Sequence, residues 1–211
     1  MKALFVTTIL VIAAATVRLQ ADKKETAPLA SGPQVGDKAP AYHPLFANGK
    51  SVGQRWCMVC THRGRGNAMV IVFARERGPA SEALAKAVET VVGKHDKVGG
   101  IVTFLTTEDK SADEAEALTG GEVRFLSLAE KTAFESLRAF AKSESITNCS
   151  LNLFTTDGPR GYEVAPDAAV TVLVADASTT VKKNIALRKD EFTVEQVDEI
   201  AAAIDKSLGS L

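Results

Sequence analysis

An uninterrupted apolar run, Ala-Met-Val-Ile-Val-Phe-Ala at residues 68–74, limits the possible folds more than any other stretch of the sequence. The run begins after Gly66 and Asn67, and it ends before a charged segment that closes with Gly78 and Pro79. Strands buried on both faces have such continuous apolar sequences, whereas strands with one solvated face alternate. We therefore expect residues 68–74 to form a central strand of a β-sheet.

A helix and a second strand are expected directly after this run. Pro79 is suited to the first position of a helix. The apolar residues that follow it recur at helical spacing on one face: Leu84, Val88, Val91 and Val92. Gly93 marks the end of the helix, and the apolar residues 101–105 predict the next strand. A strand, a helix and a strand in this order predict two parallel strands joined by a right-handed crossover.

The rest of the chain continues to mix helices and strands. The expected elements are a helix at 108–118, a short strand at 123–126, a helix at 128–142, a weakly alternating stretch at 149–154, a loop at 155–167, strands at 169–174 and 181–187, and a closing helix. Thr193 is the expected N-cap of the closing helix, with Gln196 completing a capping box.

Two cysteines precede the central strand as a Cys-x-x-Cys motif, Cys57 and Cys60, within the segment Trp-Cys-Met-Val-Cys-Thr-His at residues 56–62. Upstream of them, Asn48 and Gly49 form the dipeptide that most strongly indicates a hairpin turn. We therefore expect the cysteines to lie on or beside one arm of a hairpin.

The N-terminus has the features of a secretory signal peptide. Lys2 precedes an apolar stretch at residues 3–15, which is shorter than the ~20 residues needed to span a bilayer, and Ala21 offers a small residue for cleavage. The sequence predicts three segments, namely a signal peptide at 1–21, a linker at 22–34 and one domain at 35–211. We therefore expect an exported protein, periplasmic or secreted, without a stable membrane span after cleavage.

Composition narrows the classes of partner. The 211 residues are 45% hydrophobic and 24% charged, which is typical of a globular domain. The formal net charge is −1, so the sequence gives no electrostatic reason to expect nucleic acid as a partner.

Export favours a disulfide between Cys57 and Cys60, because disulfides persist in oxidising compartments. Such a pair is redox-active if its surroundings favour a thiolate, and His62, Arg63 and neighbouring arginines are suited to that role. A structural disulfide is the second interpretation, although so short a closed loop gains little chain entropy. Cys149 is left over, and we expect it to be a small buried strand residue.

Metal binding is the third interpretation of the motif. Thiolates and imidazole suit Cu(I) or Zn, so Cys57, Cys60 and His62 form a candidate ligand set. His43 and Cys149 would complete it only if the fold brings them close. Trp56 beside the motif either packs against the hairpin or modulates the cysteines.

The order of expected elements resembles that of the thioredoxin fold. Gly36, Ala39 and Pro40 are similar to the opening Gly-x-x-Ala-Pro of peroxiredoxin and alkyl hydroperoxide reductase-like chains, and residues 169–176 resemble their late strand, which closes with Asp before a turn. The resemblance covers about residues 35–208. It implies an α/β fold, a thioredoxin-like three-layer sandwich with a central mixed β-sheet flanked by helices.

The cysteines depart from the family pattern. Peroxiredoxins and thioredoxins keep their reactive cysteine just after the first long strand, where this chain has residues 74–81 and no cysteine. The Cys-x-x-Cys is displaced to the other side of that strand, so a typical peroxidase is not expected.

These features predict thiol-disulfide exchange at Cys57 and Cys60, without a cofactor, on protein thiols or disulfides or an exported protein partner. One sulfur would attack and the other resolve, the more accessible one attacking, with Trp56, His62 and Arg63 modulating the pair. The alternatives are a non-enzymatic thioredoxin-fold binding module with a structural disulfide, and a Cys/His protein that binds Cu or Zn.

Overall fold

The computed structural model describes residues 28–107 and 127–211. The helix expected at 108–118, the strand expected at 123–126 and the signal peptide expected at 1–21 lie outside these residues. None of the helices within the described ranges combines the length and the apolar character needed to cross a membrane.

The described residues form one mixed sheet and four α-helices. The elements are β1 (Leu45–Phe46), α1 (Met58–Gly64), β2 (Ala68–Ala74), α2 (Pro79–Val92), β3 (Val98–Thr107), α3 (Leu128–Ser143), β4 (Cys149–Thr155), β5 (Ala168–Ala175), β6 (Val181–Arg188), the 3₁₀ turn η2 (Val194–Gln196) and α4 (Val197–Leu208). The expected bounds of the central strand are confirmed, and the two helices expected at Pro79 and at residues 128–142 are also present.

The strand order is β1-β4-β3-β2-β5-β6. β2 pairs in parallel with β3, and β3 in parallel with β4, whereas β5 is antiparallel to both β2 and β6. Ile71 of β2 lies opposite Ile101 on one side and Leu173 on the other. The expected central position of β2 and the parallel pairing of β2 with β3 through α2 are therefore confirmed.

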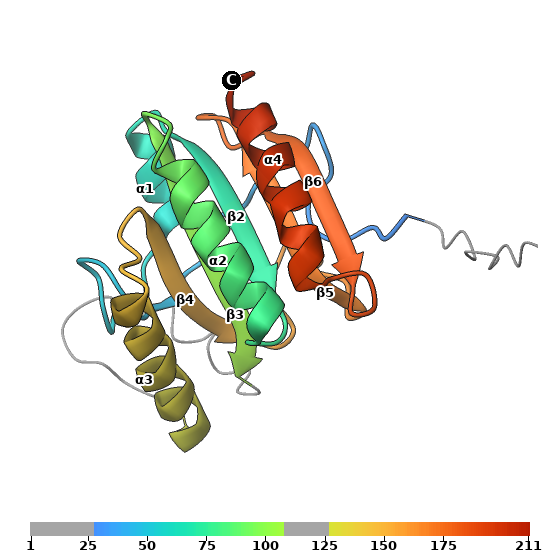
Figure 1. Cartoon of the computed structure of the whole chain (residues 1–211). Helices are drawn as coiled ribbons and strands as arrows, with labels where there is room; N and C mark the ends of the chain where they lie inside the picture. The colour runs from blue at the N-terminus through green and yellow to red at the C-terminus, as the bar shows by residue number, and fades with distance from the viewer. Residues whose placement is uncertain (1–27, 108–126) are drawn as a thin grey trace, which may run out of the picture.

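The two faces of the sheet are covered differently. Side chains alternate across a strand, so Val70 and Val72 face the cluster formed with α2, α3 and α4, while Met69, Ile71 and Phe73 face a second cluster. Figure 1 shows α2 and α4 lying over the sheet on the first face. The second face is covered by α1 and by less regular chain, whose buried residues include Ala39, Tyr42, Tyr162 and Val164.

The chain contacts the sheet before the expected start of the domain. The Ser31 hydroxyl lies 2.6 Å from the Thr171 hydroxyl, and the Asn184 amide donates to the carbonyl oxygens of Ser31 and Pro33. These contacts begin four residues before Val35, inside the segment that the sequence assigns to the linker.

Two local features differ from expectation. The sequence did not predict α1, because seven residues are too few to show a periodic apolar face. Thr193 precedes η2 and its side chain forms no capping hydrogen bond, so the expected capping box is wrong. The closing helix α4 itself is confirmed, with Val197, Ile200, Ile204 and Leu208 buried.

Candidate functional site

The Cys57 and Cys60 sulfurs form a disulfide, with 5.3 Å between the two Cα atoms. The preceding Arg55 forms an antiparallel bridge with Leu45, and the Phe46 amide donates to the Gln54 carbonyl. The motif therefore directly follows one arm of a hairpin, as expected.

Local hydrogen bonds set the start of α1 around the disulfide. Cys57 is the N-cap, and its Sγ accepts a hydrogen bond from the Cys60 amide at 3.0 Å. The Thr61 hydroxyl donates to the Cys57 carbonyl at 3.0 Å and accepts from the Trp56 indole N–H at 3.0 Å. These contacts fix the indole across the first turn of the helix.

The two bonded cysteines differ in exposure. Cys57 is 5% exposed and packs into the second apolar cluster, whereas Cys60 is exposed. Both line a depression of about 360 Å³, together with His43, Trp56 and Thr61. Trp56 is 47% exposed, so an apolar surface borders the accessible sulfur.

His62 was expected to modulate the cysteines, but it is not among the residues that line this depression. Its imidazole is buried against β3, and neither ring nitrogen has a hydrogen-bond partner among the described residues. Burial, aided by the charge of Arg65, lowers the pKa of His62 below its ordinary value. The buried ring is therefore neutral at pH 7 and fixes α1 on the sheet.

A glycine pair in β3 makes room for side chains from two neighbouring elements. A Cβ atom on Gly99 would lie 1.8 Å from His62 Cε1, and one on Gly100 would lie 2.0 Å from Cys149 Sγ. Gly99 therefore permits α1 to pack against β3, and Gly100 permits Cys149 to pack in β4.

The arginines near the motif have different surroundings. Arg55 is buried and pairs with Glu130, with 2.5 Å between Nη2 and Oε1. Arg63 and Arg65 are exposed, and neither forms an ion pair with any residue in the described ranges.

The candidate metal ligands are not assembled. Among the described residues, no group of three or more His, Cys, Asp or Glu side chains is placed to hold a metal ion. Cys149 is buried as expected, and burial raises the pKa of its thiol. It belongs to the apolar cluster on the first face of the sheet, whereas Cys57 belongs to the cluster on the second face.

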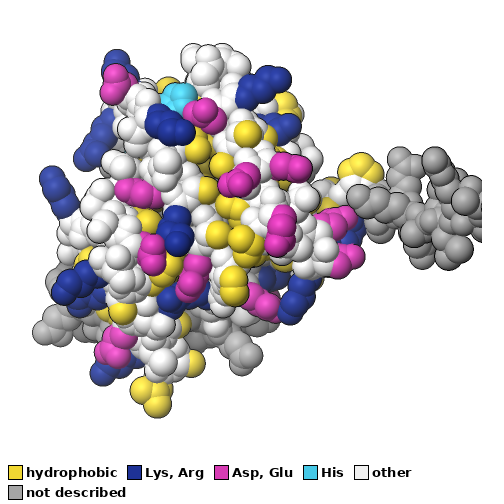
Figure 2. Space-filling view, in the orientation of Figure 1, with side chains coloured by type: hydrophobic (Ala, Val, Ile, Leu, Met, Phe, Trp, Pro, Cys, Tyr) yellow, Lys and Arg dark blue, Asp and Glu magenta, His cyan; other side chains and the backbone are white. Residues whose placement is uncertain are grey.

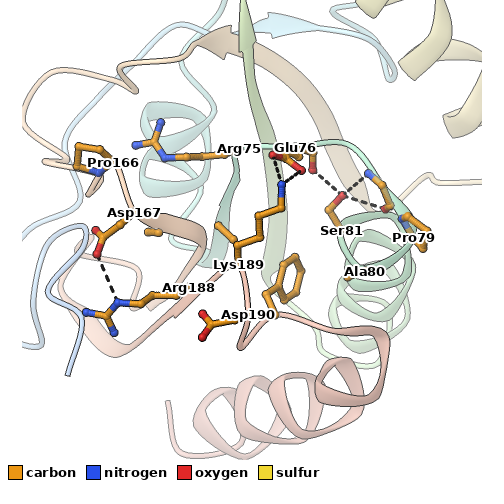
Figure 3. A pocket seen from close by; sticks show the side chains of 14 residues that line it. Arg75, Glu76, Pro79, Ala80, Ser81, Pro166, Asp167, Arg188, Lys189 and Asp190 are labelled. Atoms are coloured by element: carbon orange, nitrogen blue, oxygen red, sulfur yellow. Dashed lines mark hydrogen bonds and ion pairs between the residues drawn. The ribbon is translucent and has the colours of Figure 1, made fainter. Parts of the chain in front are cut away.

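A second cavity, of about 590 Å³, lies where β2 leads into α2 and beside the ends of β5 and β6. Figure 3 shows Lys189 paired with Glu76 and Arg188 paired with Asp167 along it. Within the described residues this cavity contains no cysteine. Ser81 Oγ accepts the Gly78 amide and donates to the Glu76 carbonyl, so its hydroxyl closes the turn before α2.

Comparison with known proteins identifies the fold. No protein-family model matches the sequence, and no curated protein matches it. An uncharacterized conserved protein from Geobacillus kaustophilus superposes with a TM-score of 0.52 at 12% identity, covering 86% of each chain. Peroxidoxin BcpB from Mycobacterium tuberculosis superposes with a TM-score of 0.51 at 12% identity, covering 84% of this chain and 97% of that one. Yeast mitochondrial 1-Cys peroxiredoxin gives 0.50 at 10% identity, over 82% and 75%.

The fold is thioredoxin-like. Identities of 10–12% support this statement about architecture and nothing finer. The cavity of Figure 3 is lined by residues that follow β2, including Arg75, Glu76, Pro79 and Ser81, whereas the disulfide precedes β2 in the sequence.

Three features of the site in this thioredoxin-like fold could not be predicted from the sequence. They are the helix that Cys57 caps, the unequal exposure of the two sulfurs, and the position of His43 beside them. His43 lies 14 residues before Cys57, with no spacing that links the two, so only the three-dimensional structure brings them together.

Proposed function

We propose that this protein carries out thiol-disulfide exchange through Cys57 and Cys60, and that Cys60 is the sulfur that bonds to the partner. The observation that carries the proposal is the unequal exposure of the bonded sulfurs. Cys60 opens on the surface depression, whereas Cys57 is 5% exposed. Exchange needs one accessible sulfur, and the other must remain close enough to resolve the mixed disulfide.

The exchange proceeds in two balanced steps. A partner thiolate attacks Cys60 Sγ, a partner–Cys60 disulfide forms, and the Cys57–Cys60 bond breaks with its electron pair on Cys57. A second thiolate of the partner then attacks the partner's sulfur in the mixed disulfide, forms a disulfide within the partner and releases Cys60 as a thiolate. The partner dithiol is oxidised by two electrons and the Cys57–Cys60 pair is reduced, with the protons passing to solvent. A partner disulfide reverses both steps.

The environment of Cys57 favours its role as the leaving thiolate. The Cys60 amide already donates to Cys57 Sγ at 3.0 Å, and such a bond strengthens when the acceptor becomes charged. A leaving thiol with a lowered pKa departs faster. His62 packs against Gly99 and so holds α1, with both cysteines, on β3. The exchange itself needs no cofactor.

Export is the second part of the proposal. A signal peptide at residues 1–21 would deliver the chain to an oxidising compartment, periplasmic or extracellular, where the disulfide persists. Mass spectrometry of the protein recovered from its source cells tests this directly. A mature chain that begins at Asp22 is expected, and an intact Met1 would contradict it.

A non-enzymatic binding module is the second candidate. It is favoured by one observation, the lack of a cysteine in the cavity of Figure 3, where thioredoxin-like proteins carry theirs. In that case the disulfide would serve only to hold the hairpin arm and α1 together.

The reduction potential of the Cys57–Cys60 pair separates the two candidates. The mature protein is equilibrated with glutathione or dithiothreitol buffers, and its thiols are counted by alkylation and mass spectrometry. A potential above about −230 mV is expected for an exchange protein, whereas a value below about −300 mV would identify a structural disulfide.

A further inference from the structure

The segment of chain around Cys60 contains basic residues and no acidic residue. From Lys38 to Arg75 the sequence contains no Asp or Glu, and this segment includes β1, α1, the disulfide and β2. On the face drawn in Figure 2 as a whole, acidic and basic side chains are interspersed. The segment of chain that holds the disulfide therefore contributes basic but no acidic side chains.

One of these basic residues, Arg63, is a helical neighbour of the accessible sulfur. Arg63 follows Cys60 by three residues in α1, and residues so spaced are neighbours on one side of a helix. Both are exposed, as is Arg65 at the C-cap. Because neither guanidinium has an ion-pair partner within residues 28–107 and 127–211, their charge is available to an approaching molecule.

Trp56 adds an apolar surface in the depression that Cys60 lines. Its indole is 47% exposed and is fixed by the hydrogen bond to Thr61. Fixed, partly exposed aromatic side chains are favoured contact residues in protein interfaces. Cys60 thus has an apolar side chain beside it in the depression and a cationic side chain three residues on in α1.

We propose that the partner of Cys60 is an acidic polypeptide segment, with a carboxylate about two residues from its own cysteine. Three residues, just under one helical turn, separate Arg63 from Cys60, which is about 4.5 Å along the axis. An extended chain advances about 3.3 Å per residue and turns every second side chain to the same face, so the side chain two positions from the attacking cysteine, about 6.6 Å along, is the first on that face that can meet the long Arg63 side chain. A polypeptide also fills the depression beside Trp56, which a smaller anionic thiol would leave open. This inference rests on the proposed exchange activity.

Peptides that differ only in charge test the inference. Each carries one cysteine with Glu, Gln or Lys two positions to either side, and glutathione serves as a small anionic thiol. Trp56 is the only tryptophan and adjoins the disulfide, so its fluorescence reports the opening of the disulfide. Rate constants are expressed per thiolate, and mass spectrometry checks that the mixed disulfide is on Cys60.

The Glu peptide is expected to react about 10-fold faster than the Lys peptide at low salt, as electrostatic steering produces. The ratio should approach one at about 1 M salt, where screening acts within about 3 Å. The R63E/R65E variant should reverse the order and R63Q/R65Q should abolish it. The matched control K183E/K206E, on exposed residues of β6 and α4, should retain it.

Other results would overturn the inference in distinguishable ways. Equal rates for the three peptides at low salt would exclude the acidic partner and leave the exchange activity intact. Glutathione as fast as the Glu peptide would exclude a polypeptide as the occupant. A disulfide that neither the peptides nor dithiothreitol can open would overturn both the inference and the exchange activity.

Discussion

At the scale of single residues, the disulfide is asymmetric, and the asymmetry predicts which cysteine can be trapped. Cys57→Ser should accumulate a mixed disulfide when a small disulfide such as oxidised glutathione is added, because the Cys60 thiolate attacks it, one glutathione thiolate leaves, and no Cys57 thiol remains to resolve the product. Cys60→Ser should accumulate about tenfold less adduct, since Cys57 is buried. Alkylation followed by peptide mapping measures both. Equal amounts of adduct in the two variants would contradict the proposal that Cys60 is the sulfur that bonds to the partner.

Gly99 provides a second residue-scale prediction. Gly99→Ala places a Cβ atom 1.8 Å from His62 Cε1, so either α1 or β3 must shift. Overpacking of this kind costs about 2–3 kcal/mol of unfolding free energy. Urea denaturation measures the loss.

Gly64 supplies the control for this substitution, because nothing lies within 4 Å of a Cβ atom built there. Gly64→Ala should remain within about 1 kcal/mol of the wild type. The H62A/G99A double variant should recover part of the loss, since the two residues are in contact. A Gly99→Ala variant as stable as Gly64→Ala would show that α1 is not fixed through this contact.

At the scale of elements, the connection between α2 and β4 depends on one carboxylate. Glu89 accepts hydrogen bonds from the backbone amides of Thr147, Asn148 and Cys149 at 2.8–2.9 Å. Glu89→Ala removes the acceptor from all three donors, and we expect a loss of roughly 2 kcal/mol in urea denaturation. Glu135→Ala, an exposed residue of α3, is the matched control and should change little. Similar values for the two variants would refute the role of Glu89.

The attachment of α1 to the sheet should depend on pH. Unfolded His62 binds a proton near pH 6.5, whereas the folded side chain, with its pKa lowered, does not. The unfolded state therefore takes up more protons, and the unfolding free energy should fall as pH drops through 6.5 until it passes the folded pKa. His62→Gln should flatten the urea-derived stability profile between pH 7 and 5, and His43→Asn should not. An unchanged slope in His62→Gln would assign the pH dependence to other groups.

Elements with long, regular patterns could be predicted from the sequence, and α1 could not. The residues 68–74 match β2 because an unbroken apolar run leaves few alternatives. α1 has seven residues and is defined by contacts that the sequence does not display, namely the Cys57 cap and the packing of His62 on Gly99. The same holds for the candidate site. The two cysteines could be identified from the sequence, but their exposure and the proximity of His43 depend on tertiary packing and could not be predicted.

At the scale of the whole molecule, the disulfide should contribute little to stability. It joins residues three apart in the sequence, and closing so short a loop removes chain entropy worth about 2 kcal/mol at most. The reduced protein should therefore unfold cooperatively in urea, with a free energy lower by no more than about 2 kcal/mol. Thermal and urea unfolding with and without dithiothreitol test this. Complete unfolding on reduction would instead favour the structural role of the disulfide.

The buried position of Cys149 has a consequence for biogenesis. In the nascent, unfolded chain all three thiols are open to oxidants, and an incorrect pair with Cys149 is as chemically feasible as the native one. Once the sheet has formed, Cys149 lies in one apolar layer, 3% exposed, and Cys57 lies in the other, so they cannot meet. Chains that fold before they are oxidised therefore acquire the native pair without a proofreading step, whereas oxidation ahead of folding traps scrambled chains.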